Sequence, residues 1–181
     1  VMDNSCNINE EIKITLIIPV LGSDIKNFKL LIENLGSNID NVIEIIAILS
    51  GVNKFDKSKN FNNLINLTDG KLKIIFNEDK LFPGAARNIG LDNSKGNYIA
   101  FLDVNTIPSS DWIKSSVNLI SDYKKSILGK TTYIFNNYFE KIFIASTYGF
   151  YPLYTVPGSL IRKDLFKKIG YFLPFTRSGE D

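Results

Sequence analysis

Short apolar segments alternate with helical patterns along the first two thirds of this chain. The segments cover residues 12–20, 42–49, 71–76 and 98–102, and they are rich in β-branched and other apolar residues. Runs of this length and character are typical of strands buried on both faces of a sheet. Pro19 is expected to end the first strand, because proline has no N–H for the ladder.

Helical spacing separates these predicted strands. Apolar residues recur at intervals of three and four between Ile25 and Leu35, which predicts a helix with Ser23 or Asp24 as N-cap and Gly36 as its end. Two more helices are predicted over residues 85–91, opened by Pro83 and Gly84, and from 112 to about 121, capped by Ser109, Ser110 and Asp111. Residues 53–63 are polar and predict a loop with at most a short helix.

Alternation of strand and helix over the first 121 residues predicts an α/β fold with a mostly parallel central sheet and right-handed crossovers. Ligands of such sheets bind beyond the carboxyl ends of the strands. The polar residues expected at those ends are Ser50, Asn77, Glu78, Asp79, Asp103 and Asn105.

The pattern changes after residue 125. Residues 126–135 and 155–161 are candidate strands, and Asp164 is expected to cap a short helix that ends at Gly170. The aromatic run over 138–154 predicts a helix or a covered loop that belongs to the core; a surface for docking an acceptor or a membrane is the alternative. Residues 175–181 read as a loop. We find no linker and no repeat, so one domain is expected over 1–181. We expect the chain to be a fragment, because it stops on Glu180 and Asp181 without a terminating element.

Composition excludes several chemistries. The chain has 181 residues, a formal charge of +2, no histidine and one cysteine. The small charge predicts no nucleic-acid partner. Without histidine there is no Ser-His or Cys-His pair and no imidazole metal site, and a single cysteine excludes an internal disulfide and a zinc cluster. No apolar run is long enough to span a bilayer, and the polar start is unlike a signal peptide.

Candidate chemistry gathers between residues 77 and 108. The helix opened by Pro83 has free N–H groups and carries Arg87 one turn in, which suits an anion. The strand YIAFL leads into Asp103, with Asn105 two residues on. If the chain stays extended, these two side chains point the same way, and their oxygens suit one hard divalent cation on a diphosphate.

Three motifs resemble the family 2 glycosyltransferases, which have the GT-A nucleotide-diphospho-sugar fold. They are IKITLIIPV, GAARNIGLDNSKGNYIAFLDVN, and VPGSLIRKDLFKKIGYF followed by SGED at the end. They come in the family's order and span nearly the whole chain. The resemblance implies an enzyme that moves a sugar from a nucleotide diphosphate to an acceptor hydroxyl with inversion. It makes residues 1–121 the nucleotide-binding half and 122–181 the start of an acceptor half.

The resemblance also implies roles for individual residues. The donor nucleotide is expected to contact Pro19, Val20, Ser50, Gly51, Arg87 and Asp103. A Mn²⁺ or Mg²⁺ ion is expected on Asp103 and Asn105, and the donor sugar or acceptor is expected near Gly158, Ser159 and Glu180. Asp181 is expected to be the general base. The implied partners are a nucleotide-sugar donor and a glycan or lipid-linked acceptor. The implied setting is the bacterial cytoplasm, at the inner membrane face, in the biosynthesis of cell-surface polysaccharide.

Three departures from the family pattern affect these expectations. Ser50 and Gly51 stand where an acidic residue usually holds the base. Leu21 and Gly22 follow the first-strand Pro-Val, and Asn105 replaces the second aspartate of Asp-x-Asp. An amide oxygen brings no charge, so weak metal affinity is expected.

These departures keep open an alternative: a catalytically impaired GT-A module that binds a nucleotide or glycan, or serves only in assembly. Asp103 and Asn105 as plain turn residues, and Arg87, Arg162 and Arg177 as surface or salt-bridge residues, are the bland alternatives. A dinucleotide oxidoreductase is excluded, because no G-x-G-x-x-G follows the first strand.

Overall fold

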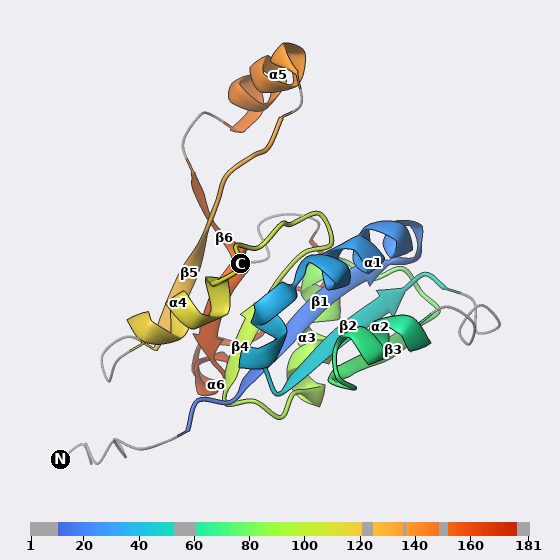
Figure 1. Ribbon diagram of the computed structural model, residues 1–181, viewed down its shortest axis with the longest axis vertical. Helices are drawn as coiled ribbons and strands as arrows, with labels where there is room; N and C mark the ends of the chain where they lie inside the picture. Colours follow the sequence, from blue (N-terminus) through green and yellow to red (C-terminus); the bar gives the residue numbers. More distant parts are fainter. Residues whose placement is uncertain (1–10, 53–60, 121–124, 136, 149–151, 177–181) are drawn as a thin grey trace.

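The structure is a computed structural model, and it describes residues 11–52, 61–120, 125–135, 137–148 and 152–176. Within these ranges a six-stranded sheet has the order β3-β2-β1-β4-β6-β5 (Figure 1). Its strands are β1 (Ile14–Leu21), β2 (Glu44–Ser50), β3 (Leu72–Asn77), β4 (Tyr98–Phe101), β5 (Ser126–Thr131) and β6 (Leu153–Arg162). The helices are α1 (Ile25–Asn34), α2 (Asn62–Leu67), α3 (Pro83–Asn93), α4 (Trp112–Leu119), α5 (Tyr138–Tyr148) and α6 (Asp164–Ile169), with 3₁₀ turns η1 (Gly22–Asp24) and η2 (Gly36–Asn41).

The predicted parallel sheet is confirmed. Strands β3, β2, β1 and β4 are parallel, whereas β6 runs antiparallel to β4 and β5 antiparallel to β6. The carboxyl ends of the four parallel strands therefore meet at one edge of the sheet. Because β6 is antiparallel, its beginning lies at the same edge, and this brings residues near 158 close to the end of β4.

Pro19 does not end β1, contrary to the sequence-based expectation. It lies inside the strand, opposite Ile48 of β2, and the strand continues to Leu21. Backbone groups alternate sides along a strand, and the carbonyl of Ile17 accepts from Leu102 just after β4. Pro19 faces that same side, but beyond the last β1–β4 pair, Ile17 with Phe101. No ladder bond is lost where β4 has already ended.

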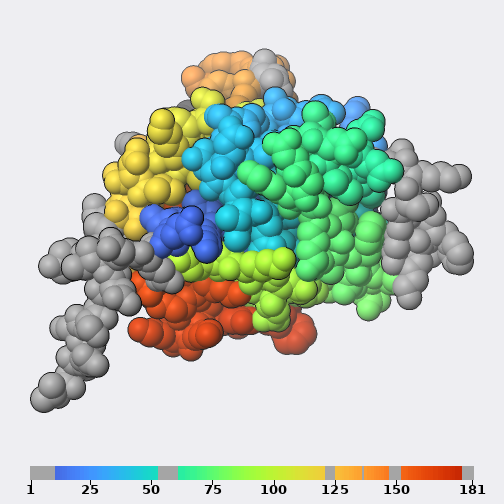
Figure 2. All heavy atoms as spheres, turned by 60° about the horizontal axis from the view of Figure 1, so that its bottom comes forward, coloured from blue at the N-terminus to red at the C-terminus, as the bar shows by residue number. Residues whose placement is uncertain are grey.

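Two hydrophobic cores cover the two faces of the sheet. On one face, even-numbered β1 residues such as Leu16 and Ile18 pack with α1, η2, α2 and α4. On the other, Ile17, Ile99 and Phe101 pack with Ala86 of α3 and with the segment around α6. Figure 2 shows this last described part of the chain, coloured red, against the yellow-green segment near residue 95. The alternation of side chains fixes which polar residues at the carboxyl edge face α3.

Gly90 lets α3 lie directly on β1. A Cβ at this position would stand 2.6 Å from Cγ2 of Ile17, closer than van der Waals contact permits. The absence of a side chain at Gly90 therefore sets the depth of α3 against the sheet, and with it the height of Arg87 one turn before.

Two of the predicted capping residues occupy N-cap positions but do not bind the helix N–H groups with their side chains. Asp24 and Asp111 are the N-cap residues of α1 and α4, without a side-chain bond to the helix N–H groups. Asp111 instead accepts from Ser115 at 2.8 Å, which lowers the pKa of its carboxyl from the ordinary value. Asp164 is the first residue of α6 and not its cap; it pairs with Nε of Arg162 at 3.1 Å.

The aromatic run is exposed, so the expectation that it belongs to the core is wrong for the side chains that the structure describes. Strands β5 and β6 extend beyond the sheet as a ribbon, and α5 lies at its far end (Figure 1). We call this ribbon with α5 the arm. Its exposed apolar side chains are Leu128, Tyr133, Ile134, Phe135, Tyr138, Phe139, Ile142, Phe143 and Tyr154. An apolar pattern alone cannot distinguish a core element from a protruding one.

Within the described part of the chain, no helix is both long and apolar enough to cross a membrane.

Candidate functional site

Asp103 and Arg87 meet at the carboxyl edge of the sheet. Asp103 follows β4 and continues the side of Ile99 and Phe101, the side that faces α3. Arg87 comes from the first half of α3, and its Nη2 lies 3.0 Å from Oδ1 of Asp103. The Arg87 side chain is 3% exposed and that of Asp103 is 44% exposed. A buried cation is thus neutralised by a carboxylate that remains open to solvent.

A turn holds Asp103 in this position. The hydroxyl of Thr106 accepts from the Asp103 N–H at 3.1 Å and donates to the Asp103 carbonyl, which also accepts from the Thr106 N–H at 3.0 Å. The backbone on either side of the carboxylate is therefore fixed. Among the described residues, none donates to the second carboxylate oxygen of Asp103. That oxygen is available to a cation or a hydroxyl from a ligand.

The aromatic ring of Phe172 packs against the guanidinium of Arg87. Its Cζ lies 5.5 Å from the centre of the Phe172 ring, in cation–π range. The sequence-based expectation gives Arg87 a direct contact with the base or the diphosphate. In the structure its described contacts are with Asp103 and Phe172, and its burial makes it a support for the carboxylate.

Asn105 does not share the direction of Asp103. The expectation of an extended chain is wrong here, because Val104 and Asn105 form the turn that Thr106 closes. The amide oxygen of Asn105 accepts from Asn27 of α1 at 2.8 Å. Both side chains are exposed. Asn105 therefore lies at the surface of the carboxyl edge, on the side of the sheet that α1 covers.

The ends of β1 and β2 approach each other closely. A Cβ on Gly22 would stand 3.0 Å from the carbonyl oxygen of Gly51, and Gly51 has a φ of +71°. The buried hydroxyl of Ser50 donates to the carbonyl of Val20 at 3.4 Å. Glycines are required here because two chain segments leave the sheet side by side.

The segment after β3 crosses the end of β2. The N–H of Gly51 donates to the carbonyls of Asn77 and Asp79, both at 3.0 Å. A Cβ on Gly51 would stand 2.7 Å from Cγ of Lys80, so the alkyl part of Lys80 covers Gly51. The sequence analysis did not identify Lys80, which places the alkyl part of a cationic side chain against the end of β2.

Gly158 and Ser159 close the ribbon where it leaves the sheet. Gly158 has a φ of +87°, and its carbonyl accepts from Nε1 of Trp112 at 2.7 Å. Ser159 is fully buried; its hydroxyl accepts from the Gly129 N–H at 2.8 Å and donates to the Thr155 carbonyl at 2.7 Å. Both bonds hold the β5–β6 bulge, so Ser159 supports the backbone of the site.

The expected base lies outside the described residues, as do Glu180 and Arg177. The role of Asp181 therefore stays a prediction.

The described side chains at this edge offer few ligands for a divalent metal. Within the described ranges no group of three or more Asp, Glu, Cys or His residues could hold one. Asp103 offers one oxygen, and the Asn105 oxygen is engaged by Asn27. Mg²⁺ commonly binds proteins through one or two carboxylates and takes its other ligands from water and substrate phosphates. The site fits an ion of this kind, bound together with a diphosphate.

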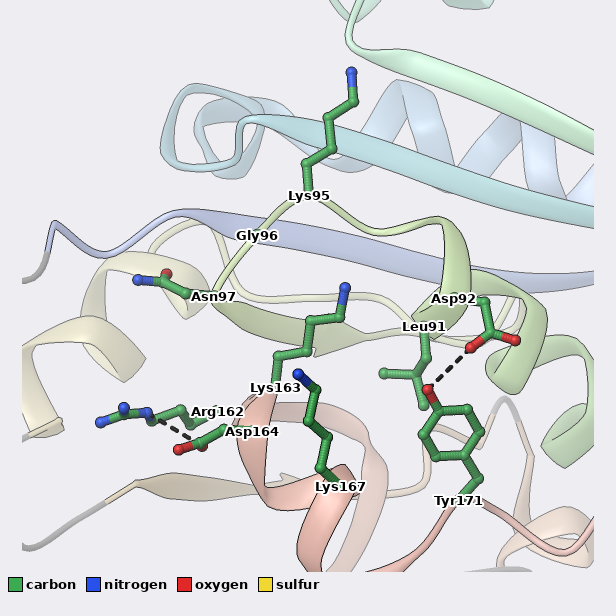
Figure 3. Close-up of a pocket in the computed structure, with 10 residues that line it drawn as sticks. All are labelled: Leu91, Asp92, Lys95, Gly96, Asn97, Arg162, Lys163, Asp164, Lys167 and Tyr171. Carbon is green, nitrogen blue, oxygen red and sulfur yellow. Dashed lines mark hydrogen bonds and ion pairs between the residues drawn. The ribbon is translucent and has the colours of Figure 1, made fainter.

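A separate cavity of about 460 Å³ lies at the opposite edge of the sheet (Figure 3). Figure 3 shows Tyr171 directed at Asp92, to which its hydroxyl donates at 2.9 Å, and this bond raises the pKa of Tyr171 from its ordinary value. Lys163 donates to the carbonyl of Ser94 at 2.7 Å. These contacts join α6 to the end of α3.

Three supporting residues were missed from the sequence. Thr106 and Phe172 gave no recognisable signal, because their partners are distant or depend on a turn. Asn88 could have been identified as a candidate from the sequence, because it follows Arg87 directly in the ARN motif. Its side-chain amide binds the backbone N–H and carbonyl of Phe172.

Comparison with known proteins supports the resemblance. The sequence profile described as Glycosyl transferase family 2 matches residues 15–178. A Haemophilus influenzae protein named "uncharacterized glycosyltransferase" is 33% identical over 107 residues, which cover 59% of this chain and 42% of that protein.

Solved structures share the fold. TarS 1–349 of S. aureus in complex with UDP-GlcNAc superposes with a TM-score of 0.64 at 19% identity, covering 93% of this chain and 51% of that one. The mannosyltransferase PcManGT of Pyrobaculum calidifontis, in complex with GDP-Man and Mn²⁺, gives 0.57 at 13% identity, with 91% and 48% covered. The chain thus spans about half the length of these proteins or less.

The sheet order, the edge that carries Asp103 and the profile match agree with one another. The chain belongs to glycosyl transferase family 2 and has the GT-A fold.

Proposed function

We propose that the carboxyl edge of the sheet binds a nucleotide diphosphate sugar, and that the sugar is transferred to an acceptor hydroxyl with inversion. The observation that carries this proposal is the Asp103 carboxylate. It is half-exposed at the ligand-binding edge of a family 2 chain, and it is fixed on one oxygen by buried Arg87. A group held in this way keeps its orientation as a ligand arrives.

Asp103 would take the hydroxyls of the ribose or the ion that accompanies the diphosphate. A Mn²⁺ or Mg²⁺ ion held by Asp103, with its other ligands from water and the phosphates, would neutralise charge on the leaving diphosphate. Relatives of the same fold support this, since one was solved with GDP-Man and Mn²⁺.

The nucleoside would lie across the ends of β1 and β2, against Pro19, Val20, Ser50 and Gly51. Ser50 is buried and turned to a backbone carbonyl. We infer that the base is recognised by backbone groups and by the cation of Lys80, in place of a carboxylate.

Asp181 would accept the proton of the acceptor hydroxyl, a step worth roughly 10²–10⁴ in rate for general bases. Gly158 and Glu180 would lie beside the transferred sugar. The acceptor would be a glycan or a lipid-linked glycan, met at the cytoplasmic face of a membrane. The exposed aromatic side chains of the arm support this, because such rings cover sugar and lipid surfaces alike.

One observation favours a second function, a module that binds a donor without transferring its sugar. The Asn105 oxygen is engaged by Asn27 and brings no charge, so the metal would be held by Asp103 alone. Binding with no turnover would select this alternative.

The test is conversion of UDP-GlcNAc and GDP-mannose, followed by NMR with Mn²⁺ present and simple glycosides as acceptors. We expect an α-linked donor to give a β-linked product, and Asp181→Asn to abolish transfer while nucleotide binding is retained. A product with retained configuration, or unchanged turnover by Asp181→Asn, would refute the mechanism.

A further inference from the structure

We propose that Phe172, anchored by Asn88, is a positioning residue of the donor site: its ring holds the Arg87 guanidinium, and Arg87 in turn orients Asp103. The proposal rests on the donor site proposed above and deepens it. It adds to that site the described residues after α6, 170–176, none of which has a hydrogen bond or ion pair with Asp103.

The anchor is a pair of hydrogen bonds. The side-chain amide of Asn88 donates to the Phe172 carbonyl at 2.9 Å, and its oxygen accepts from the Phe172 N–H at 3.0 Å. The two residues are 84 positions apart in the chain. Because both backbone groups of one residue are bound by one planar amide, the position of Phe172 against α3 is fixed in direction as well as distance.

The ring of Phe172 is held on its other sides by aromatic neighbours. Its centre lies 5.4 Å from that of Phe101 at 83°, and 5.7 Å from that of Phe166. Phe172 is 8% exposed. The enclosing contacts restrict the ring, and the guanidinium of Arg87 lies over it with Cζ 5.5 Å from its centre.

The position of the Phe172 ring affects Asp103 through the Arg87 guanidinium, which contacts both. Arg87 contacts Asp103 through Nη2, at the end of a side chain with several rotatable bonds. The Phe172 ring restricts the orientation of the guanidinium by attraction to the cation and by occupying the space beside it. The free oxygen of Asp103 is thereby presented in one direction.

The test compares Phe172→Leu with Phe166→Leu. Both residues are buried members of the same aromatic cluster, but Phe172 is the one placed against Arg87. Leucine preserves most of the apolar volume and removes the ring. On α3, Asn88→Ala is paired with Asn93→Ala, whose amide caps the exposed carbonyl of Ile89 in the same helix.

The first measurement is ¹⁵N NMR of the Arg87 Nε–H group in the protein without ligand. We expect a ring-shifted, slowly exchanging signal in the wild type, Phe166→Leu and Asn93→Ala, and loss of that shift in Phe172→Leu and Asn88→Ala. The same signal in Phe172→Leu as in Phe166→Leu would overturn the proposal.

The second measurement is calorimetry with UDP and Mn²⁺. Phe172→Leu is expected to weaken the affinity by roughly three- to tenfold, because the Arg87 side chain would then be ordered only when the ligand binds, and Phe166→Leu to leave it within about twofold. Equal losses of UDP affinity in both variants would show that Phe172 acts only as a core residue, and would overturn the proposal. Absence of UDP and GDP binding in the wild type would refute the donor site itself, whereas the NMR comparison would still decide whether Phe172 holds Arg87.

Discussion

The ion pair between Arg87 and Asp103 has one buried and one exposed partner, so the two halves should respond differently to mutation. The guanidinium is 3% exposed and the carboxylate 44%. Removing Asp103 leaves a charge inside the protein without this counter-charge. Removing Arg87 leaves a carboxylate that water can reach. The exposed partner should therefore be the costlier one to lose, contrary to the usual expectation that exposed residues tolerate substitution.

The magnitudes follow from burial. Breaking a buried pair costs about 3–5 kcal/mol when a charge stays behind. We take about 3 kcal/mol for Asp103→Ala, since the space left by the carboxylate opens to solvent. Arg87→Met keeps the apolar stem and loses a charged hydrogen bond, which costs about 1–2 kcal/mol when the remaining carboxylate is hydrated. In the double variant neither charge of this pair remains, so its loss should be about 1–2 kcal/mol as well.

Urea unfolding of the wild type, both single variants and the double variant at pH 7 measures these values. Arg87→Met should restore stability to Asp103→Ala, raising its melting temperature by roughly 2–8 °C for a domain of this size. Additive losses, or a larger loss for Arg87→Met than for Asp103→Ala, would refute the reasoning.

Three further predictions rest on other parts of the fold. Gly90→Ala should destabilise by about 1–3 kcal/mol in thermal unfolding, because its Cβ would overlap β1; helix propensity alone predicts stabilisation, so a gain would contradict the packing. The double change Phe139→Ser with Phe143→Ser removes side chains that are 84% and 68% exposed, so unfolding and UDP affinity should stay unchanged while acceptor turnover falls; a loss of stability would show that the arm is covered. Asp111 has a lowered pKa because Ser115 donates to its carboxylate, so its contribution to stability is present above pH 3.8 and is lost as pH falls through the lower folded value. Ser115→Ala should move the Asp111 titration back toward 3.8 in a carbon-detected NMR series, and an unmoved titration would contradict the cause.

The parallel sheet and its ligand edge were predictable because both follow from local pattern. Each buried strand is a short β-branched run, and parallel strands must end at one edge. Asp103 at the end of YIAFL was predictable in the same way, and its contact with Arg87 follows from the face that alternation assigns to it.

Other features depend on contacts that no local pattern encodes. The side chain of Asn105 points away from that of Asp103 because residues 103–106 form a turn, closed by the bond from the Thr106 N–H to the Asp103 carbonyl. Ser159 is drawn into the β5–β6 bulge by Gly129, thirty positions away. The aromatic run around Phe139 has the composition of a core helix, and it is exposed because α5 lies at the far end of the ribbon, away from the sheet (Figure 1).

The central claim is that Asp103, held by Arg87, binds the donor. Calorimetric titration of UDP and GDP with and without Mn²⁺ into the wild type and Asp103→Asn tests it most directly, since asparagine preserves shape and removes the charge. We predict binding that is strengthened by Mn²⁺ in the wild type and a loss of that metal dependence in Asp103→Asn. Nucleotide binding with the same affinity and the same response to Mn²⁺ in both proteins would contradict the account.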